Sequence, residues 1–330
     1  MNQNELHVIF GTGQLGMAVM HELVHQGKKV RMVNTRGQAD VPAGVEVVKG
    51  DAYSPDSVQT LTAGAQVVYQ CAQPGITQWP QKFPALQASI LEGTARSGAR
   101  LVIGENLYMY GEVSGPIHEG LPYNATTRKG RTRAQITEAA LAAHQAGKLR
   151  VVIGRGSDFF GPGVLNSAVG GERFIQPALQ GKSAQLVGRL DIPHTVTFIE
   201  DFGRALVLLG EHEEAYGQAW HVPNDQPHIT QRQLMTMFFE ESGQKPRIKR
   251  MGPLMLAIGR LFIPEAREGM EMAYEFEQPF VVDSSKFEGA FGMQATPLRE
   301  AVRRTVGWYR EHAELKRLEQ KISQPQAIAD

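Results

Sequence analysis

Residues 6–27 read LHVIFGTGQLGMAVMHELVHQG. Three features follow one another in this stretch: a short apolar run, a glycine-rich turn and a helical repeat. The apolar run at 6–10 predicts a buried β-strand, because it is short and is bounded by glycine. Residues 14–26 predict a helix, since apolar side chains recur at helical spacing and Gly27 follows as a stop. A strand that turns directly into a helix is typical of an alternating α/β chain.

The turn between this strand and this helix matches the pattern G-x-G-x-x-G. It consists of Gly11, Thr12, Gly13, Gln14, Leu15 and Gly16. In such a loop Gly11 permits the tight turn, Gly13 lets a pyrophosphate approach the backbone, and Gly16 lets the helix pack on the strand. The N-terminus of the helix offers free N–H groups to the anion. We therefore expect a dinucleotide-binding loop; the alternative is an ordinary glycine-rich turn.

The second strand, expected at 30–33, indicates which dinucleotide binds. NAD-binding folds usually carry an acid after this strand to hold the ribose 2′-hydroxyl. Here Asn34, Thr35 and Arg36 follow the strand, and residues 23–39 contain no acid. An arginine can bind a 2′-phosphate through paired hydrogen bonds, whereas a carboxylate would repel it. The sequence therefore favours NADP(H) over NAD(H), unless Arg36 is a solvated charge and Asn34 alone holds the adenosine.

The same alternation continues through the first half of the chain. Further strands are expected at 45–48, 67–71, 101–104 and 151–155, and helices near 55–62, 84–98 and 131–147. Strands that alternate with helices predict a parallel sheet covered on both faces. Because parallel crossovers are right-handed, we expect a Rossmann-type, doubly wound sheet.

The pattern loosens after about Gly161, where shorter elements follow. Elements are expected at 198–209 (a strand end running into a helix), 230–243 (a helix) and 296–318 (a helix). The apolar stretch 251–263 is too short to span a membrane. It could line an apolar substrate pocket; the alternative is a buried helix or a subunit contact.

A chain of 330 residues is long enough for one large α/β domain or two coupled domains. We expect residues 1–160 to form a dinucleotide-binding Rossmann domain, with return segments near 196–222. Residues 161–330 are expected to form mainly a smaller α+β substrate-binding domain.

The composition excludes several classes of protein. Lys and Arg total 34, and Asp and Glu total 34, so the formal net charge is zero. A neutral chain without a basic tail argues against nucleic acid as a partner. The single cysteine, Cys71, allows no intrachain disulfide and favours a reducing compartment. With no secretory pattern and no stretch of 18 apolar residues, we expect a soluble, cytoplasmic protein that binds no membrane.

Several segments carry a resemblance to a known family. They are 11–16, 50–51, 67–72, 110–111, 160–163, 198–201 and 220–243. In their order and spacing, the chain resembles the extended short-chain dehydrogenase/reductase superfamily, in its NAD-dependent epimerase/dehydratase branch. The resemblance implies an N-terminal cofactor domain, a C-terminal substrate domain and an active site between them. It also implies a homodimer paired through the helices near 84–98 and 131–147.

The chain departs from this family at the residues that carry its chemistry. Phe10 stands where the family's glycine loop has its first glycine. The family's acid/base pair is Tyr-x-x-x-Lys, and aligning its helix places Thr127 and Arg131 at those two positions. A shifted alignment would bring Lys129 or Lys148 into the lysine's role. Threonine cannot replace the tyrosine as a proton donor, because its pKa is far too high.

Other side chains are therefore expected to carry the chemistry. Asn106 stands at the family's Ser or Thr position and could donate a hydrogen bond to a substrate carbonyl. Tyr108 is the first candidate proton donor and Tyr110 the second; the alternative is that both rings only pack. Arg131 could bind ribose hydroxyls and supply positive charge. His194 is a candidate acid that contacts the substrate, although a lone loop histidine is more often structural.

The remaining expected contacts lie at strand ends and in loops. Asp51 is expected near the adenine edge, unless it only caps a turn; by resemblance, Ser157 and Asp158 lie beside the nicotinamide. The expected cofactor contacts are Gly11, Thr12, Gly13, Gln14, Leu15, Gly16, Asn34, Thr35, Arg36, Asp51, Ala52, Cys71, Ala72, Gln73, Arg131, Ser157 and Asp158. The expected substrate contacts are Tyr123, Phe159 and His194.

Two functions fit these residues. The first is an NADP(H)-dependent oxidoreductase or epimerase/dehydratase-like enzyme that acts on a small carbonyl or hydroxyl compound without Tyr-x-x-x-Lys. The second is a regulator or redox sensor that binds NADP(H) without catalysis. No metal is expected: His21 and His25 match the H-E-x-x-H pattern of zinc proteases, but their helix already belongs to the glycine loop.

Overall fold

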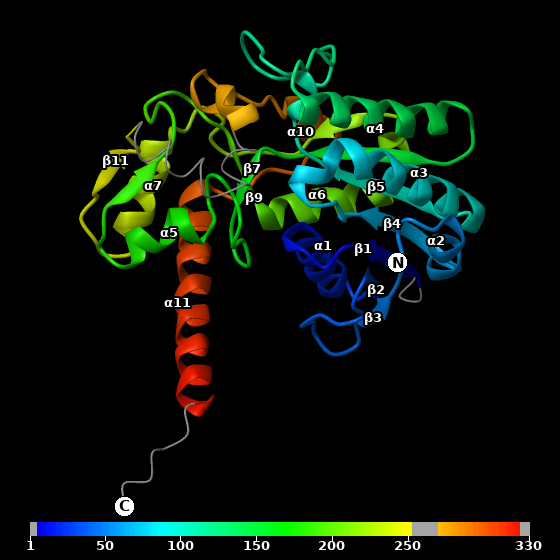
Figure 1. The fold of residues 1–330 in the computed structure, drawn as a ribbon, viewed down its shortest axis with the longest axis horizontal. Coiled ribbons are helices and arrows are strands. Elements are labelled where there is room, and N and C mark those ends of the chain that lie inside the picture. Colours follow the sequence, from blue (N-terminus) through cyan, green and yellow to red (C-terminus); the bar gives the residue numbers. More distant parts are fainter. Residues whose placement is uncertain (1–4, 253–269, 324–330) are drawn as a thin grey trace, which may run out of the picture.

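A computed structural model describes residues 5–252 and 270–323 of the chain. The centre of the molecule is a seven-stranded sheet in the order β10-β6-β5-β4-β1-β2-β3, and every pairing in it is parallel. Its strands are β1 (Leu6–Phe10), β2 (Lys29–Asn34), β3 (Glu46–Lys49), β4 (Ala65–Gln70), β5 (Arg100–Glu105), β6 (Val151–Arg155) and β10 (Ala219–His221). The predicted doubly wound parallel sheet is confirmed (Figure 1).

Helices cover both faces of this sheet. On one face lie α2 (Pro55–Leu61), α3 (Trp79–Ser97) and α4 (Arg128–Gln145), and on the other α1 (Gln14–His25) and α6 (Ile199–Glu211). Side chains alternate along a strand, so Val8 and Phe10 enter the first core while Ile9 enters the second. Because both faces are buried, the central strands are nearly continuous apolar runs, which is why they could be found in the sequence.

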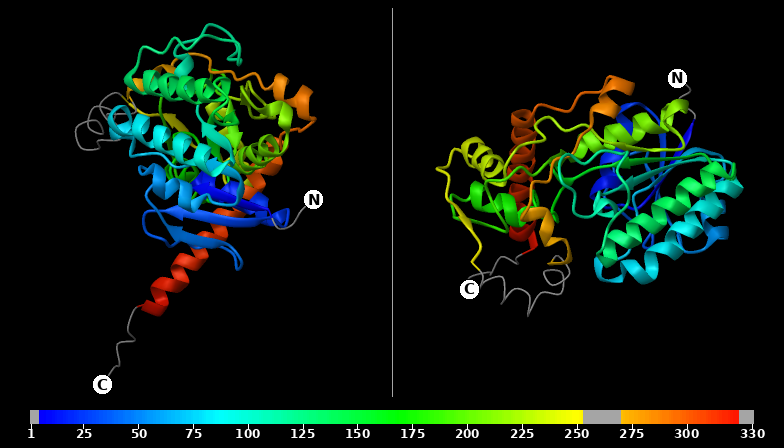
Figure 2. Two further views of the ribbon diagram at one scale, coloured as in Figure 1. Left: turned by 90° about the vertical axis from the view of Figure 1, so that its right-hand side faces the viewer. Right: turned by 90° about the horizontal axis from the view of Figure 1, so that it is seen from above.

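A smaller second lobe lies beside the sheet (Figure 1, Figure 2). Its elements are α5 (Glu172–Leu179), β8 (Ala184–Leu186), α7 (Gln231–Glu241), β11 (Ile248–Arg250) and α11 (Leu298–Ser323). They enclose a separate hydrophobic core that includes Phe174, Phe238 and Val302. This lobe mixes helices with short strands, as predicted for the C-terminal part of the fold.

The chain crosses between the two lobes more than once. β7 (Asp158–Phe160) and β9 (Val196–Phe198) pair in parallel, and β10 joins the sheet beside β6. The 3-10 helix η4 (Met270–Phe276) and the helix α10 (Ser285–Phe291) follow later in the chain. Between these two, Phe280 forms a bridge with His194. Segments from distant parts of the sequence therefore meet beside the ends of the sheet strands.

Local chemistry sets the ends of α7, as expected. Thr230 caps this helix and forms a capping box with Gln233, and Gly243 follows with a φ of 72°. From residue 253 on, the apolar stretch expected at 251–263 lies outside the described residues. Among the helices that the structure does describe, none is both long enough and apolar enough to cross a membrane.

Candidate functional site

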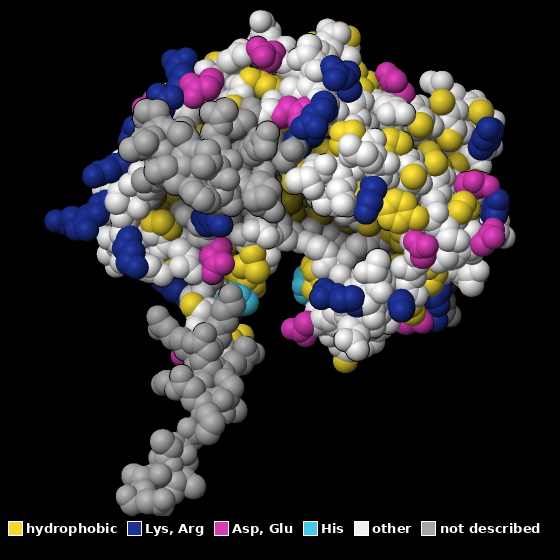
Figure 3. All heavy atoms as spheres, viewed as in Figure 1, with side chains coloured by type: hydrophobic (Ala, Val, Ile, Leu, Met, Phe, Trp, Pro, Cys, Tyr) yellow, Lys and Arg dark blue, Asp and Glu magenta, His cyan; other side chains and the backbone are white. Residues whose placement is uncertain are grey.

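A cavity of about 810 Å³ opens at the carboxyl ends of β1, β4, β5 and β6. Loops of the second lobe and η4 supply its other wall. Figure 3 shows the surface notched between the two lobes. Ligands of parallel α/β sheets collect at this edge, and the volume lies within the range of roughly 300–1,000 Å³ that is usual for small-molecule and cofactor sites.

The glycine loop forms one end of this cavity. Gly11 has a φ of 103°, and a Cβ atom there would lie 2.8 Å from the backbone nitrogen of Ala72. A Cβ atom on Gly16 would collide with the carbonyl oxygen of Gly11, so helix and loop pack without a side chain. By contrast, a Cβ atom on Gly13 would meet nothing within 4 Å. Gly13 precedes α1, which has no side-chain cap and no acid in its first turn. The free N–H groups of α1 therefore fit a pyrophosphate group.

Asn34 organises the loop after β2. Its Nδ2 atom donates to Thr12 Oγ1 and to the carbonyl oxygen of Gln38, each at 2.9 Å. Its Oδ1 atom accepts from the backbone N–H groups of Arg36 (2.9 Å) and Gly37 (2.6 Å). All the hydrogen-bonding capacity of the amide is thereby used within the loop. Asn34 therefore fixes the loop that carries Arg36, whose side chain is exposed.

Most of the expected cofactor contacts line the cavity. They are Gly11, Gly13, Gln14, Leu15, Asn34, Thr35, Asp51, Ala52, Cys71, Ala72, Gln73, Ser157 and Asp158. Thr12, Gly16, Arg36 and Arg131 do not line it. Asp51 also accepts a hydrogen bond from the backbone N–H of Tyr53 at 2.9 Å, so the cavity contact and the turn cap coexist. Burial raises the pKa of the Cys71 thiol to about 12, so this side chain is a neutral part of the wall.

Asn106 and Tyr108 line the cavity beyond the end of β5. Tyr108 opens the 3-10 helix η2 (Tyr108–Tyr110), and its backbone N–H donates to Asn106 Oδ1 at 3.3 Å. Burial, and then the nearby carboxyl groups of Glu275 and Asp158, raise the pKa of Tyr108 well above its ordinary value. The phenol therefore stays protonated, and it can donate a hydrogen bond into the cavity.

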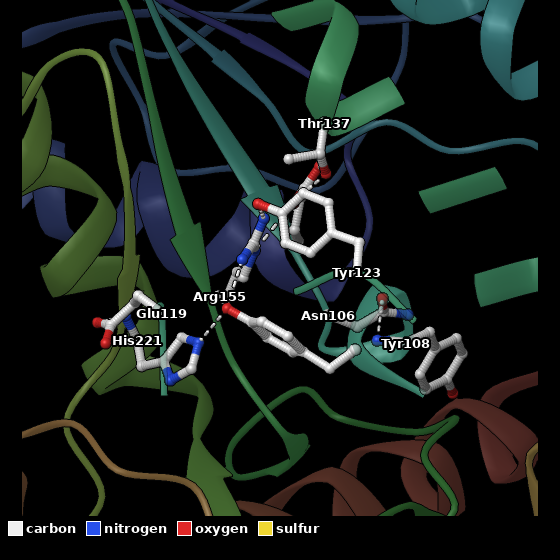
Figure 4. A network of polar contacts seen from close by, with 9 residues as sticks. Asn106, Tyr108, Glu119, Tyr123, Thr137, Arg155 and His221 are labelled. Atoms are coloured by element: carbon white, nitrogen blue, oxygen red, sulfur yellow. Dashed lines mark hydrogen bonds and ion pairs between the residues drawn. The ribbon is translucent and has the colours of Figure 1, made fainter. Parts of the chain in front are cut away.

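Tyr110 belongs to a buried polar network and does not line the cavity. Figure 4 shows Tyr123, Arg155 and His221 of this network. The Tyr110 hydroxyl accepts from Arg155 Nη1 at 2.5 Å and lies 2.8 Å from His221 Nε2. His221 Nδ1 faces the carbonyl oxygen of Asp283 at 3.0 Å. Burial, and then the charge of Arg155, lower the pKa of His221 to about 3, so the ring is neutral. Nδ1 then carries the proton and Tyr110 donates to Nε2.

Tyr123 belongs to the same network and does not line the cavity. The Tyr123 hydroxyl accepts from Arg155 Nη2 at 2.7 Å, and Arg155 Nε donates to Glu105 at 3.2 Å. Arg155 is fully buried, so its charge needs these partners. The expectation that Tyr110 and Tyr123 face the reaction or the substrate is therefore corrected: both hydroxyls serve the buried guanidinium.

The cation expected at Arg131 is supplied by a different arginine. Thr127 caps α4 by accepting from the backbone N–H of Gly130, and Arg131 points outward, where it bonds the carbonyl oxygen of Thr126. Arg133, two residues further on, is buried and lines the cavity. Its Nη2 atom donates to Gln73 Oε1 at 3.0 Å.

Arg133 is held by two aromatic rings. Its guanidinium carbon lies 4.3 Å from the ring centre of Trp79 and 4.5 Å from that of Phe83. Burial lowers the pKa of Arg133 to about 10, so it stays charged at neutral pH. Lys129 lies one helical turn earlier and bonds Glu271 at 2.8 Å. Lys129 and Arg133 thus lie four residues apart on α4, and both are buried.

His194 lies behind the cavity wall and supports it. Its Nε2 atom lies 2.9 Å from Asp158 Oδ2, and its Nδ1 atom lies 3.1 Å from the carbonyl oxygen of Glu275. The ring stacks against Phe276 and Phe280, with centroids 4.8 and 5.2 Å away. His194 is 2% exposed and does not line the cavity. Its place corrects the expected direct contact with substrate: it positions Asp158.

Two cavity residues were missed in the sequence. Arg133 could have been found, because it shares a helical face with Lys129 at the family's spacing. Glu275 carries no motif, and it reaches the cavity because His194 holds η4 there, through the Glu275 carbonyl oxygen and the ring of Phe276. Phe159, expected to contact substrate, does line the cavity. Among the described residues, no group of three or more His, Cys, Asp or Glu is arranged to hold a metal ion.

Comparison with known proteins places the chain in a family. The sequence model of the NAD dependent epimerase/dehydratase family matches residues 8–222, which is more than half of the chain. No curated protein sequence matches it.

Solved structures share the whole fold at low sequence identity. An epimerase from Methanothermobacter thermautotrophicus is 16% identical, with a TM-score of 0.77 over 95% of this chain and 94% of that chain. The UDP-N-acetylglucosamine 4-epimerase from Bacillus cereus is 13% identical, with a TM-score of 0.75 over 93% and 97%. The dTDP-glucose 4,6-dehydratase from Bacillus anthracis, solved with NAD, is 16% identical, with a TM-score of 0.76 over 94% and 98%.

Proposed function

The chain belongs to the NAD-dependent epimerase/dehydratase family, and we propose that it is an enzyme that uses NADP(H) to act on a small carbonyl or hydroxyl compound. One observation carries this proposal. The glycine loop lies at one end of the 810 Å³ cavity, and the proton-bearing Tyr108 lines the same cavity. A dinucleotide bound at the loop would therefore share one cavity with groups able to bind a substrate oxygen.

The preference for NADP(H) rests on the loop after β2. The similar dehydratase binds NAD, which supports a pyridine nucleotide but leaves the choice between the two open. In this chain, the side-chain amide of Asn34 bonds the backbone of the loop. It thereby holds Arg36 at the exposed rim. An arginine here would bind a 2′-phosphate through charge-assisted hydrogen bonds.

The side chains at the far end of the cavity define what the site does. When bound, the nicotinamide would supply or accept a hydride. The Asn106 amide and the Tyr108 hydroxyl would donate hydrogen bonds to the substrate oxygen, where negative charge develops. Arg133 would supply a fixed positive charge in the cavity.

The lining of this end favours a neutral, apolar substrate. Phe159, Met272, Phe276 and Phe280 contribute hydrophobic surface. Asp158 places a carboxyl group in the same wall, which disfavours an anionic substrate. Small aldehydes and ketones, or the corresponding alcohols, fit this chemistry.

The second candidate is a regulator that binds NADP(H) without catalysis. One observation favours it: Thr127, aligned with the family's tyrosine, only caps α4. The two functions differ in turnover and share the cofactor.

An assay of NADPH oxidation separates them. Wild-type protein is mixed with NADPH and benzaldehyde, acetophenone or cyclohexanone, and the same carbonyls are tested with NADH. The enzymatic proposal predicts oxidation with at least one carbonyl, faster with NADPH than with NADH. Binding of NADPH without oxidation by any of the three would contradict the enzyme and support the regulator.

A further inference from the structure

Glu275 is a carboxyl group without a partner in the wall of the cavity. Its side chain is 3% exposed, and its Oε1 atom has no hydrogen-bond partner among the described residues. The residue lines the cavity together with Asn106 and Tyr108. A buried polar atom without a partner is costly. Such an atom in a cavity wall is expected where a ligand supplies the missing bond.

The backbone on either side of Glu275 is held firmly. Its carbonyl oxygen lies 3.1 Å from His194 Nδ1, and Phe276 stacks on the same imidazole. The neighbouring residue Tyr274 accepts, through its carbonyl oxygen, from the backbone N–H of Glu277. The carboxyl group is therefore placed by fixed surroundings, and its Oε1 atom makes no hydrogen bond to the described residues.

The surroundings keep this carboxyl group protonated. Burial, and then the charge of Asp158 on β7, raise the pKa of Glu275 well above its ordinary value. Tyr108 of η2 and Tyr274 of η4 itself also lie near it, and His194 faces its backbone carbonyl oxygen. Neither tyrosine is ionised at neutral pH, since burial raises the pKa of both. A neutral, proton-bearing carboxyl group thus belongs to the same cavity wall as Asn106 and Tyr108.

We propose that the carboxyl group of Glu275 exchanges a proton with the substrate oxygen, in the role that the family gives to a tyrosine. This role rests on the proposed function. In the reducing direction, the O–H bond of Glu275 breaks, its electron pair stays on the carboxylate, and the proton joins the carbonyl oxygen. The carbonyl carbon takes the hydride of the reduced nicotinamide, so the carbonyl becomes an alcohol and the nicotinamide is oxidised. The carboxylate regains its proton from water after the product leaves.

Glu275 suits this role better than Tyr108. In the family, a lysine lowers the pKa of the tyrosine, whereas here burial and two carboxyl groups raise the pKa of Tyr108. A phenol in such surroundings holds its proton too tightly to be an efficient acid. A carboxyl group whose pKa is raised above its ordinary value by burial lies closer to the optimum than a phenol whose pKa is raised further. Tyr108 then serves as a hydrogen-bond donor, and Glu275 moves the proton.

The test compares four proteins with NADPH and benzaldehyde over a range of pH: wild type, Glu275→Gln, Glu275→Asp and Glu277→Gln. Glu277 is the matched control, because it lies two residues away, is exposed and pairs with Arg250. We expect Glu275→Gln to lower kcat by about 100-fold or more while NADPH affinity, measured by calorimetry, stays unchanged. Glu275→Asp should restore part of the rate, and Glu277→Gln should behave as wild type.

The pH profile separates a catalytic proton from a structural one. The wild-type rate should fall as pH rises through the raised pKa of Glu275. Tyr108→Phe should show the same decrease with pH, whereas Glu275→Gln should not. Carbon-13 NMR of glutamate-labelled protein should show one protonated carboxyl at neutral pH that is absent from Glu275→Gln. Near-normal turnover by Glu275→Gln, or no protonated carboxyl in wild type, would overturn the role of Glu275 alone. Wild-type protein that binds NADPH but reduces no carbonyl would instead overturn the proposed function.

Discussion

The Nε2 atom of His194 lies 2.9 Å from Oδ2 of Asp158. Its Nδ1 atom faces the backbone carbonyl oxygen of Glu275, which can only accept, so Nδ1 carries a proton. Nε2 lies against the carboxyl group of Asp158 on β7, while the ring packs against Phe276 and Phe280. One imidazole thus joins β7 to the backbone of η4, and one wall of the cavity is built on this contact.

Removing this imidazole should destabilise the protein. His194→Phe keeps a ring between Phe276 and Phe280 but leaves Asp158 and the Glu275 carbonyl oxygen without their partner. We expect the free energy of unfolding in urea to fall by about 1–3 kcal/mol. His212→Phe is the control, because His212 is only half-buried, bonds Glu214 and meets Phe291 edge-on, away from the cavity. Equal stability of His194→Phe and wild type would show that the histidine supports nothing.

Glu275→Gln should change how stability depends on pH. The pKa of Glu275 is raised above its ordinary value of 4.5, so the folded protein holds this proton more tightly than the unfolded chain. As pH rises above 4.5, the unfolded state loses the proton first and wild-type stability falls, by at most about 1.4 kcal/mol per pH unit. Glutamine has no such proton. In thermal unfolding, the stability of Glu275→Gln relative to wild type should therefore increase as pH rises above 4.5, until the folded protein also loses the proton. A constant difference between the two proteins would contradict the raised pKa.

Substitutions of the two tyrosines of η2 should have different effects, one on stability and the other on kcat. Tyr110→Phe removes a bond from both Arg155 and His221, and should lower the free energy of unfolding by about 1–3 kcal/mol with NADPH affinity unchanged. Tyr108→Phe should leave stability within about 0.5 kcal/mol and lower kcat with benzaldehyde by about 100-fold. Urea unfolding and NADPH oxidation measure the two effects. If Tyr110→Phe lowered kcat and Tyr108→Phe lowered stability instead, the wrong tyrosine would have been assigned to the cavity.

Arg133 and Arg131 offer a matched pair on one helix. Arg133→Ala removes the buried cation from the cavity and should weaken NADPH binding by about tenfold or more in calorimetric titration. Arg131→Ala should leave the affinity unchanged, because its guanidinium bonds the carbonyl oxygen of Thr126 and does not line the cavity. Arg133→Lys should restore little, since lysine cannot stack as a plane between Trp79 and Phe83. An equal loss of NADPH affinity in Arg133→Ala and Arg131→Ala would contradict the assignment of the cavity cation to Arg133.

Features that depend on local sequence could be predicted. The strand, glycine turn and helix at 6–27 obey short-range rules of apolar spacing and backbone freedom, and the structure contains them as expected. The parallel sheet followed because strands alternated with helices. Asn106 and Tyr108 reached the cavity because the carboxyl end of a parallel strand faces it.

Features that depend on distant contacts could not be predicted. Glu275 gains its importance from its burial and from the charge of Asp158, which lies more than a hundred residues earlier. Tyr110 was expected at the site because it flanks the same strand end as Tyr108. Its hydroxyl instead accepts a hydrogen bond from the buried guanidinium of Arg155. The prediction for Arg131 was wrong for a geometric reason: a shift of two residues turns a side chain to the opposite face of a helix.

The central claim is that the glycine loop and Arg36 bind NADP(H). Calorimetric titration of wild type, Arg36→Ala and the control Lys29→Ala with NADPH, NADP, NADH and NAD tests it most directly. Lys29 is exposed at the opposite end of β2. The account predicts that wild type and Lys29→Ala bind NADPH at least about tenfold more tightly than NADH, and that Arg36→Ala loses this preference, worth about 1.5–3 kcal/mol. Binding of none of the four nucleotides, or a preference for NADH in wild type, would contradict it.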